Sequence, residues 1–93
     1  GPSPDDLLTA WAESNLGNCM RDQNRFSEAE PLLLHAYERL VARLGECHPI
    51  SLESKERIWT LYRRWHAAEP TGGHEKQAAK FEAIHAEAND REN

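Results

Sequence analysis

The stretch that decides the fold is "RFSEAEPLLLHAYERLVARLGECHP", residues 25–49. Its apolar residues recur at steps of three and four, the spacing that places side chains on one face of an α-helix. Ser27 is followed three residues later by Glu30, the pattern of a capping box, and Pro31 lies within the first turns. Gly45 supplies a left-handed stop. We therefore predict an amphipathic helix over residues 27–44, whose inward face is formed by Ala29, Leu32, Leu33, Ala36, Leu40 and Leu44.

Further helices are predicted on both sides of this one. Ser3 can cap a first helix over about residues 4–24, with Pro4 at its first position. Its expected apolar face consists of Leu8, Trp11, Ala12, Leu16, Cys19 and Met20. His48 and Pro49 open a third helix, which ends before the clear break "EPTGG" at residues 69–73. A fourth helix is expected over about residues 74–89. Because no segment alternates as a strand does, the chain is predicted to be all-α.

Length, charge and cysteine content restrict the class of protein. With 93 residues the chain forms one domain, and its net charge of -5 argues against binding of nucleic acid. It has no apolar run of the roughly 20 residues that cross a membrane, and its start does not resemble a signal peptide. Two cysteines do not make a disulfide framework, so we expect a cytoplasmic protein. We interpret the opening residues 1–4, Gly-Pro first, as a tag scar or leader on a piece of a longer protein.

The sequence also shows an internal repeat. A shift of 42 residues places Leu16 on Ile58, Met20 on Tyr62 and Arg21 on Arg63. Within this frame "NLGNCMRDQNRFSEAEPLLLHAYERLVARLGECHPIS" resembles a tetratricopeptide repeat of the 42-residue, kinesin-light-chain-like type. The matching residues are Leu16, Gly17, Phe26, Ala29, Glu30, Pro31, Leu32, Leu33, Ala36, Leu44, Gly45, His48 and Pro49.

This resemblance implies two antiparallel helix hairpins, four helices in all, stacked as a fragment of an α-solenoid. The first hairpin would span residues 5–45, and the second, atypical capping hairpin would span residues 49–90. Gly17 and Ala29 are small, as a close helix crossing requires. Trp59 stands where the second hairpin would carry a small residue, and the turn before the last helix is too long for a regular repeat. The chain is also similar to the terminal repeats of bacterial proteins that join such arrays to Ser/Thr kinase domains.

Side chains that could carry chemistry are few. Cys19, Cys47, His35 and His48 do not have the spacing of zinc ligands, because Cys47 and His48 are adjacent. That pair is also the sole candidate for a nucleophile beside a base. The segment "TGGHEK" lacks the spacing of a phosphate-binding loop. We therefore predict no catalytic residue, no metal, no cofactor and no enzyme activity.

The resemblance also implies a concave groove, lined by the first helix of each hairpin, that holds an extended peptide. The inward positions would be Trp11, Ser14, Asn18, Arg21, Glu53, Glu56, Thr60 and Arg63. Of these we expect peptide contacts from Trp11, Asn18, Arg21, Thr60 and Arg63. The planar arginine forks suit an acidic or carboxylate-bearing peptide. Ser14 stands where a carboxylate-clamping repeat carries Lys, so that clamp is not expected.

Three interpretations of function remain open at this stage. The first is a protein interaction module that binds a peptide or partner segment. The second is self-association as a homodimer or a structural cap, since repeat arrays usually need about three units to be stable. The third, which rests on the resemblance alone, is a regulatory piece of a kinase-containing polypeptide. For the polar positions of the groove, the alternative to peptide binding is a simple solvated face. The aromatic residues Trp59, Tyr62 and Trp65 either fill the core or expose a tryptophan as a binding anchor.

Overall fold

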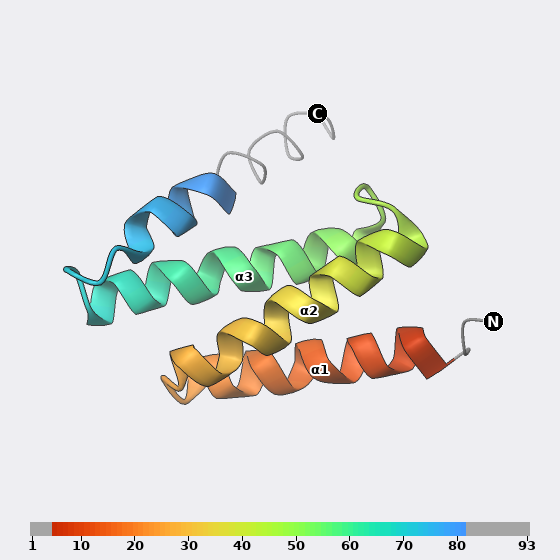
Figure 1. The fold of residues 1–93 in the computed structure, drawn as a ribbon, viewed down its shortest axis with the longest axis horizontal. Coiled ribbons are helices and arrows are strands. Elements are labelled where there is room, and N and C mark those ends of the chain that lie inside the picture. The colour runs from red at the N-terminus through yellow and green to blue at the C-terminus, as the bar shows by residue number, and fades with distance from the viewer. Residues whose placement is uncertain (1–4, 82–93) are drawn as a thin grey trace.

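The computed structural model describes residues 5–81, with side chains from Leu7 onward. Its helices are α1 (Asp5–Asp22), α2 (Phe26–Leu44) and α3 (Pro49–Ala68), and residues 74–81 are helical as well (Figure 1). No strand occurs within residues 5–81. The prediction of an all-α fold is therefore confirmed. The expected leader at residues 1–4 and the expected end of the last helix at residues 82–89 lie outside the described residues.

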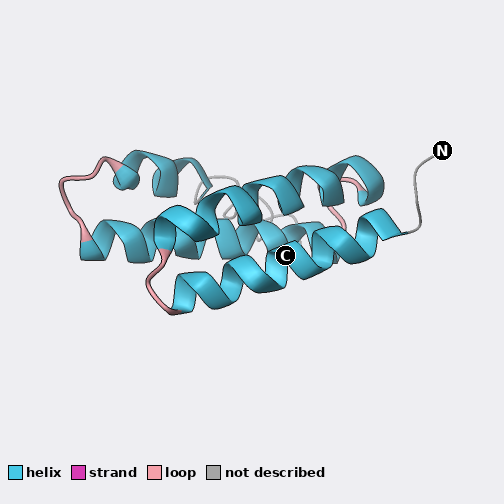
Figure 2. Ribbon diagram, turned by 60° about the horizontal axis from the view of Figure 1, so that its bottom comes forward, coloured by secondary structure: helices cyan, strands magenta, loops and turns pink. Residues whose placement is uncertain are grey.

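The helices form a stack of antiparallel hairpins. Helices α1 and α2 run in opposite directions side by side, and α3 returns along α2, roughly parallel to α1 (Figures 1 and 2). Residues 74–81 then turn back over α3 (Figure 1). Helix α2 contacts both neighbours along its length, whereas α1 and α3 meet in few places. This leaves space between α1 and α3 for a surface site.

The start of α2 differs from the sequence prediction. Helix α2 begins at Phe26, its cap is Arg25, and no side chain caps it, so the predicted capping box at Ser27 is wrong. The reason lies in the preceding turn. Asn24 adopts a positive φ of 62°, and the Arg25 amide donates to the Met20 carbonyl over 2.8 Å. After this turn the helix begins at Phe26, one residue earlier than predicted, and Phe26 is buried in the core.

The link between α2 and α3 follows the prediction. Gly45 has a φ of 89°, and its N–H donates to the Val41 carbonyl over 2.8 Å, which ends α2 at Leu44. His48 then caps α3, because its Nδ1 accepts the Ile50 N–H over 3.1 Å, with a proline at the first helical position. The predicted start of the third helix is therefore confirmed.

The core lies between α2, α3 and residues 74–81. From the predicted inward face of α2, four residues are buried and Leu32 and Leu44 are half-buried. The buried apolar residues of these elements are Phe26, Ala29, Leu33, Ala36, Leu40, Ile58, Leu61, Tyr62, Ala78 and Phe81. Tyr62 stacks on Phe81 with ring centroids 5.9 Å apart, and Trp59 and Trp65 pack against the same cluster. The aromatic residues of α3 thus fill the core.

The predicted inward face of α1 is largely wrong. Leu8 is 69% exposed and Leu16 is 50% exposed, and Ala12 and Cys19 are also exposed. The buried positions of α1 are instead small residues, namely Ala10, Ser14 and Gly17. Small side chains let the two helices approach closely. Leu8 and Leu16 are therefore left exposed, whereas Met20 packs against the core as predicted. Cys19 was expected to pack in the core and is instead exposed.

Candidate functional site

A polar pocket of about 310 Å³ lies between α1 and α3. Its lining residues are all polar, four charged and two neutral, and they come from two helices: Asn18 and Arg21 from α1, and Glu53, Glu56, Arg57 and Thr60 from α3. Steps of three and four residues bring the α3 side chains to one face. Of the predicted peptide-binding residues, the pocket brings together Asn18, Arg21 and Thr60. Glu53 and Glu56 were also among the positions expected to face inward.

Arg57 is the residue in this pocket that sequence reasoning missed. Its Nη1 donates to Ser14 Oγ over 2.9 Å and to Asn15 Oδ1 over 3.0 Å, both on α1. Its Nη2 pairs with Glu53 Oε1 over 3.2 Å on the same helix. Arg57 therefore bridges the two helices that form the pocket. The Glu53–Arg57 spacing of four residues was a signal that could have been read, since such pairs share one helix face.

Arg21 is fixed within the pocket by other contacts. Its Nη1 donates to the main-chain oxygen of Arg57 over 3.3 Å, and its Nη2 pairs with Asp22 Oδ1 over 3.1 Å. The same Asp22 oxygen accepts from Arg64 of α3 over 3.1 Å. The Arg21 side chain is only 11% exposed. These contacts hold its guanidinium in one orientation beside Asn18.

The two remaining predicted residues lie outside the polar pocket. The guanidinium of Arg63 lies 5.2 Å from the centre of the Trp59 ring, and its side chain is exposed. Trp11 does not line the polar pocket, but its ring contacts Arg57, whose guanidinium carbon is 5.2 Å from the centre of that ring. The structure therefore does not gather all five predicted residues into one site.

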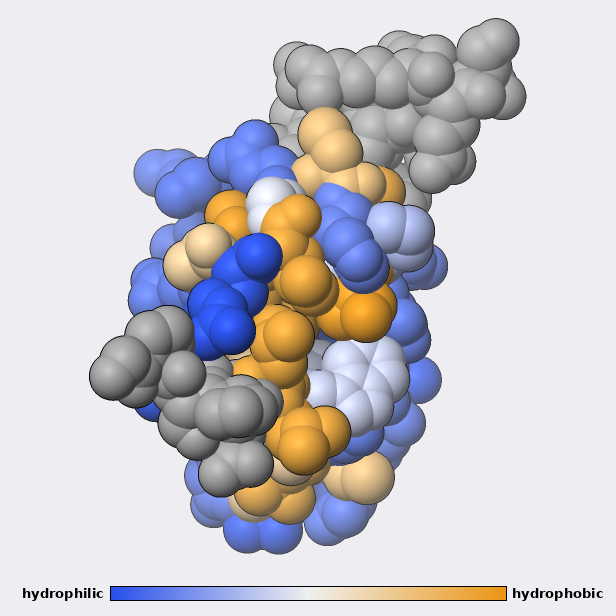
Figure 3. Space-filling model, turned by 90° about the vertical axis from the view of Figure 1, so that its right-hand side faces the viewer, coloured by the Kyte–Doolittle hydropathy of each residue, from blue (hydrophilic) through white to orange (hydrophobic). Residues whose placement is uncertain are grey.

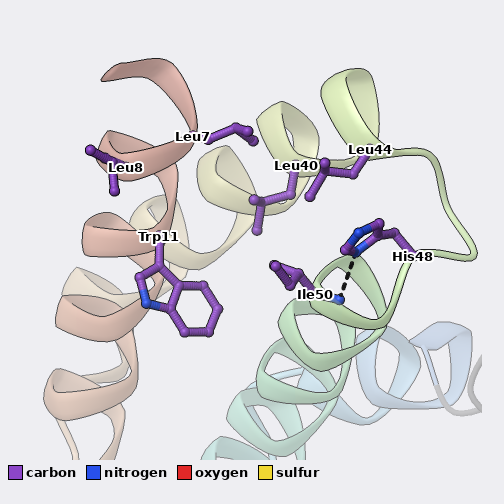
Figure 4. A pocket seen from close by; sticks show the side chains of 7 residues that line it. All are labelled: Leu7, Leu8, Trp11, Leu40, Leu44, His48 and Ile50. Carbon is purple, nitrogen blue, oxygen red and sulfur yellow. Dashed lines mark hydrogen bonds between the residues drawn. The ribbon is translucent and has the colours of Figure 1, made fainter. Parts of the chain in front are cut away.

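Trp11 instead forms one wall of a second, apolar pocket of about 270 Å³ (Figure 4). This apolar pocket lies where the first turns of α1 and α3 meet the last turns of α2, and a band of apolar side chains covers that end of the molecule (Figure 3). Its lining residues are Leu7, Leu8 and Trp11 of α1, Leu40 and Leu44 of α2, and His48 and Ile50 at the start of α3.

Other polar contacts serve the fold. The Tyr62 hydroxyl donates to Glu30 Oε2 over 2.7 Å, and burial, followed by this bond and the charge of Glu30, raises the pKa of Tyr62 well above its ordinary value. Glu13 joins α1 to α2, because its carboxylate contacts His35 Nδ1 at 2.9 Å and Arg39 at 3.4 Å. His35 is thus engaged in a helix–helix contact.

The described residues 5–81 hold no metal-binding cluster and no membrane-spanning helix. In that range no three histidine, cysteine or acidic side chains are grouped so as to hold a metal ion. Cys19 and Cys47 are both exposed. None of the described helices has the length and apolar character needed to cross a membrane.

Comparison of the chain with models of known protein families, with curated proteins and with solved structures yields no match. The interpretation of the site therefore rests on its geometry, on the chemistry of the two pockets and on the sequence resemblance described above.

Proposed function

We propose that this chain is a non-catalytic protein interaction module, which binds an extended segment of a partner protein in the pocket between α1 and α3. One observation carries this proposal. Asn18, Arg21 and Thr60, which the family resemblance assigns to a peptide groove, line a single pocket. The resemblance to tetratricopeptide repeats favours the same face of the molecule.

The lining of the polar pocket suits a peptide main chain. It combines two arginines with two glutamates, and adds one amide and one hydroxyl. A peptide backbone offers alternating N–H donors and C=O acceptors and carries no net charge. Asn18 and Thr60 can each donate and accept, so they match such a chain at any register. Because these side chains lie on packed helices, little conformational entropy is lost when a ligand binds.

An acidic residue of the partner would find its counterpart in Arg21 or Arg57. In the structure these arginines already pair with Asp22 and Glu53 respectively. A ligand carboxylate would replace one of these carboxylates, and a two-pronged arginine contact could then form. One acidic residue of the partner therefore adds only the difference in free energy between the new ion pair and the ion pair that it replaces.

Selection from a library of random ten-residue peptides displayed on phage tests this function. We expect enriched peptides to lose at least about tenfold in affinity on Thr60→Val combined with Asn18→Leu, since both changes remove polar groups at similar volume. Thr9→Val combined with Gln77→Leu is the matched control, because both residues are exposed and line neither pocket. No enrichment, or enriched peptides that bind both double variants equally, would refute the proposal.

Self-association is a second candidate function, and the outer face of α1 favours it. Leu8 and Leu16 are the large apolar residues exposed there, with Ala12 exposed between them. A second copy of the chain could cover this face in a symmetric dimer. Light scattering after gel filtration would then give a dimer mass that Leu16→Asp reduces to that of a monomer. A monomer mass for the unmodified chain at every concentration excludes this candidate.

A further inference from the structure

The apolar pocket has the size and chemistry of a receptor for one large side chain. Among the side chains that the structure describes, from Leu7 to Phe81, every lining residue except His48 is apolar, and none of the lining residues is acidic, lysine or arginine. Its volume of about 270 Å³ exceeds the roughly 150 Å³ of a cavity that accommodates benzene. An indole, a phenyl ring or a leucine side chain therefore fits. A charged group would lose its hydration there without gaining a partner.

His48 does not change this apolar character. Its Nδ1 accepts the Ile50 N–H over 3.1 Å, as Figure 4 shows, so the ring proton of the neutral imidazole is on Nε2. The imidazole is thereby committed to capping α3. Apart from the ring N–H groups of His48 and Trp11, the described lining can recognise an occupant only by its shape and its apolar surface.

The apolar and polar pockets adjoin each other along the same two helices. Trp11 lines the apolar pocket and Arg57 lines the polar pocket, and the Arg57 guanidinium carbon is 5.2 Å from the centre of the Trp11 ring. On α1 the step from Trp11 to Asn18 is seven residues, and on α3 the step from Ile50 to Arg57 is also seven. Seven residues of helix rise by roughly 10 Å, a distance that an extended peptide covers in about three residues.

We propose that the apolar pocket is the anchor subsite of the peptide groove. It takes a large uncharged apolar side chain, such as leucine, phenylalanine or tryptophan, that lies about three residues from the part of the same peptide held in the polar pocket. This inference rests on the proposed peptide-binding function and specifies its partner. The partner is an extended segment defined by one apolar anchor and an adjoining polar stretch, rather than by acidic residues alone.

Two exposed leucines of α1 provide a matched pair of variants. Leu8 borders the apolar pocket and is 69% exposed, whereas Leu16 is 50% exposed and borders neither pocket. Neither side chain supports the core, so the fold should tolerate Leu8→Asp and Leu16→Asp alike. Leu8→Asp places a carboxylate at the rim of the apolar pocket, where an apolar anchor would strip its water. Leu16→Asp adds the same charge to the same helix away from the pocket.

The peptides enriched from the phage library are the probe for this experiment. We expect them to share a large apolar residue. We also expect Leu8→Asp, or alanine in place of that residue, to weaken binding by about ten- to a hundredfold, the range set by burying one such side chain. Leu16→Asp should leave the affinity unchanged.

The outcomes separate this inference from the function on which it rests. If the enriched peptides lose affinity for the chain with Thr60→Val and Asn18→Leu but keep their affinity for Leu8→Asp, the anchor subsite is overturned and the peptide groove is retained. A chain that enriches no peptide would overturn both. A dimer mass that Leu8→Asp reduces to that of a monomer would also overturn the anchor subsite, because a second copy would then occupy the pocket.

Discussion

Gly17→Ala tests the close crossing of α1 and α2, because two effects of opposite sign compete at this position. A Cβ at residue 17 would lie 2.8 Å from Leu33 Cγ and 2.9 Å from Leu33 Cδ2, well inside an ordinary carbon contact of about 3.5–4.0 Å. Leu33 is fully buried, so it has no free space to move into. Such overpacking costs typically about 1–3 kcal/mol. Alanine in place of a helical glycine returns about 1 kcal/mol.

The cost of crowding should exceed the gain in helix propensity here, because Leu32 Cβ also lies close to the added carbon, at 3.3 Å, and blocks a sideways shift. We expect Gly17→Ala to lower the free energy of unfolding by about 1–2 kcal/mol, measured by urea unfolding with circular dichroism. Ala12→Gly, at an exposed position of the same helix, is the control and should cost about 1 kcal/mol. A gain in stability from Gly17→Ala equal in size to the loss from Ala12→Gly would refute the close crossing.

Three more changes probe single contacts by the same urea assay. Tyr62→Phe removes the hydrogen bond to Glu30 and should cost about 1–2 kcal/mol. Because the pKa of Tyr62 is higher in the folded chain, its contribution to the free energy of unfolding is complete below about pH 10 and is lost as the pH rises further. If Tyr62→Phe lost stability as steeply above pH 10 as the unmodified chain does, this reasoning would be wrong. Arg57→Ala leaves the buried Ser14 hydroxyl without its donor and should cost about 1–3 kcal/mol, whereas no change would mean that Arg57 does not join α1 to α3. His48→Ala removes the cap of α3 and should cost about 1 kcal/mol, and unaltered stability would rule out this cap.

The sequence predicts α2 well because both of its long sides are covered. Residues at steps of three and four are buried against α1 on one side and against α3 on the other. Its end at Gly45 and the start of α3 at His48 depend on local backbone chemistry, which short motifs encode directly. The start of α2 was misjudged because the turn at Asn24 is held by main-chain hydrogen bonds that no side-chain pattern announces.

The candidate site could be predicted only in part from the sequence. The family resemblance assigns Asn18 and Thr60 to one groove, and the polar pocket contains both. Spacing could not show that Arg57 reaches across to Ser14, because that contact depends on the distance between α1 and α3. The apolar pocket was not foreseen for the same reason. It arises where three helix ends meet, and no periodicity within one helix describes such a junction.

The misread face of α1 differs in burial from the matching face of α3. With a shift of 42 residues, Leu16 corresponds to Ile58 and Ala12 corresponds to Ser54. Ile58 and Ser54 are fully buried, and Ile58 belongs to the core formed with α2, whereas Leu16 and Ala12 are exposed. Equivalent positions thus differ in burial because α3 packs against α2 and also against residues 74–81, whereas within residues 5–81 α1 packs mainly against α2 alone. Hydrophobic periodicity identifies a face that is suited to burial; whether that face is buried depends on the element that packs against it.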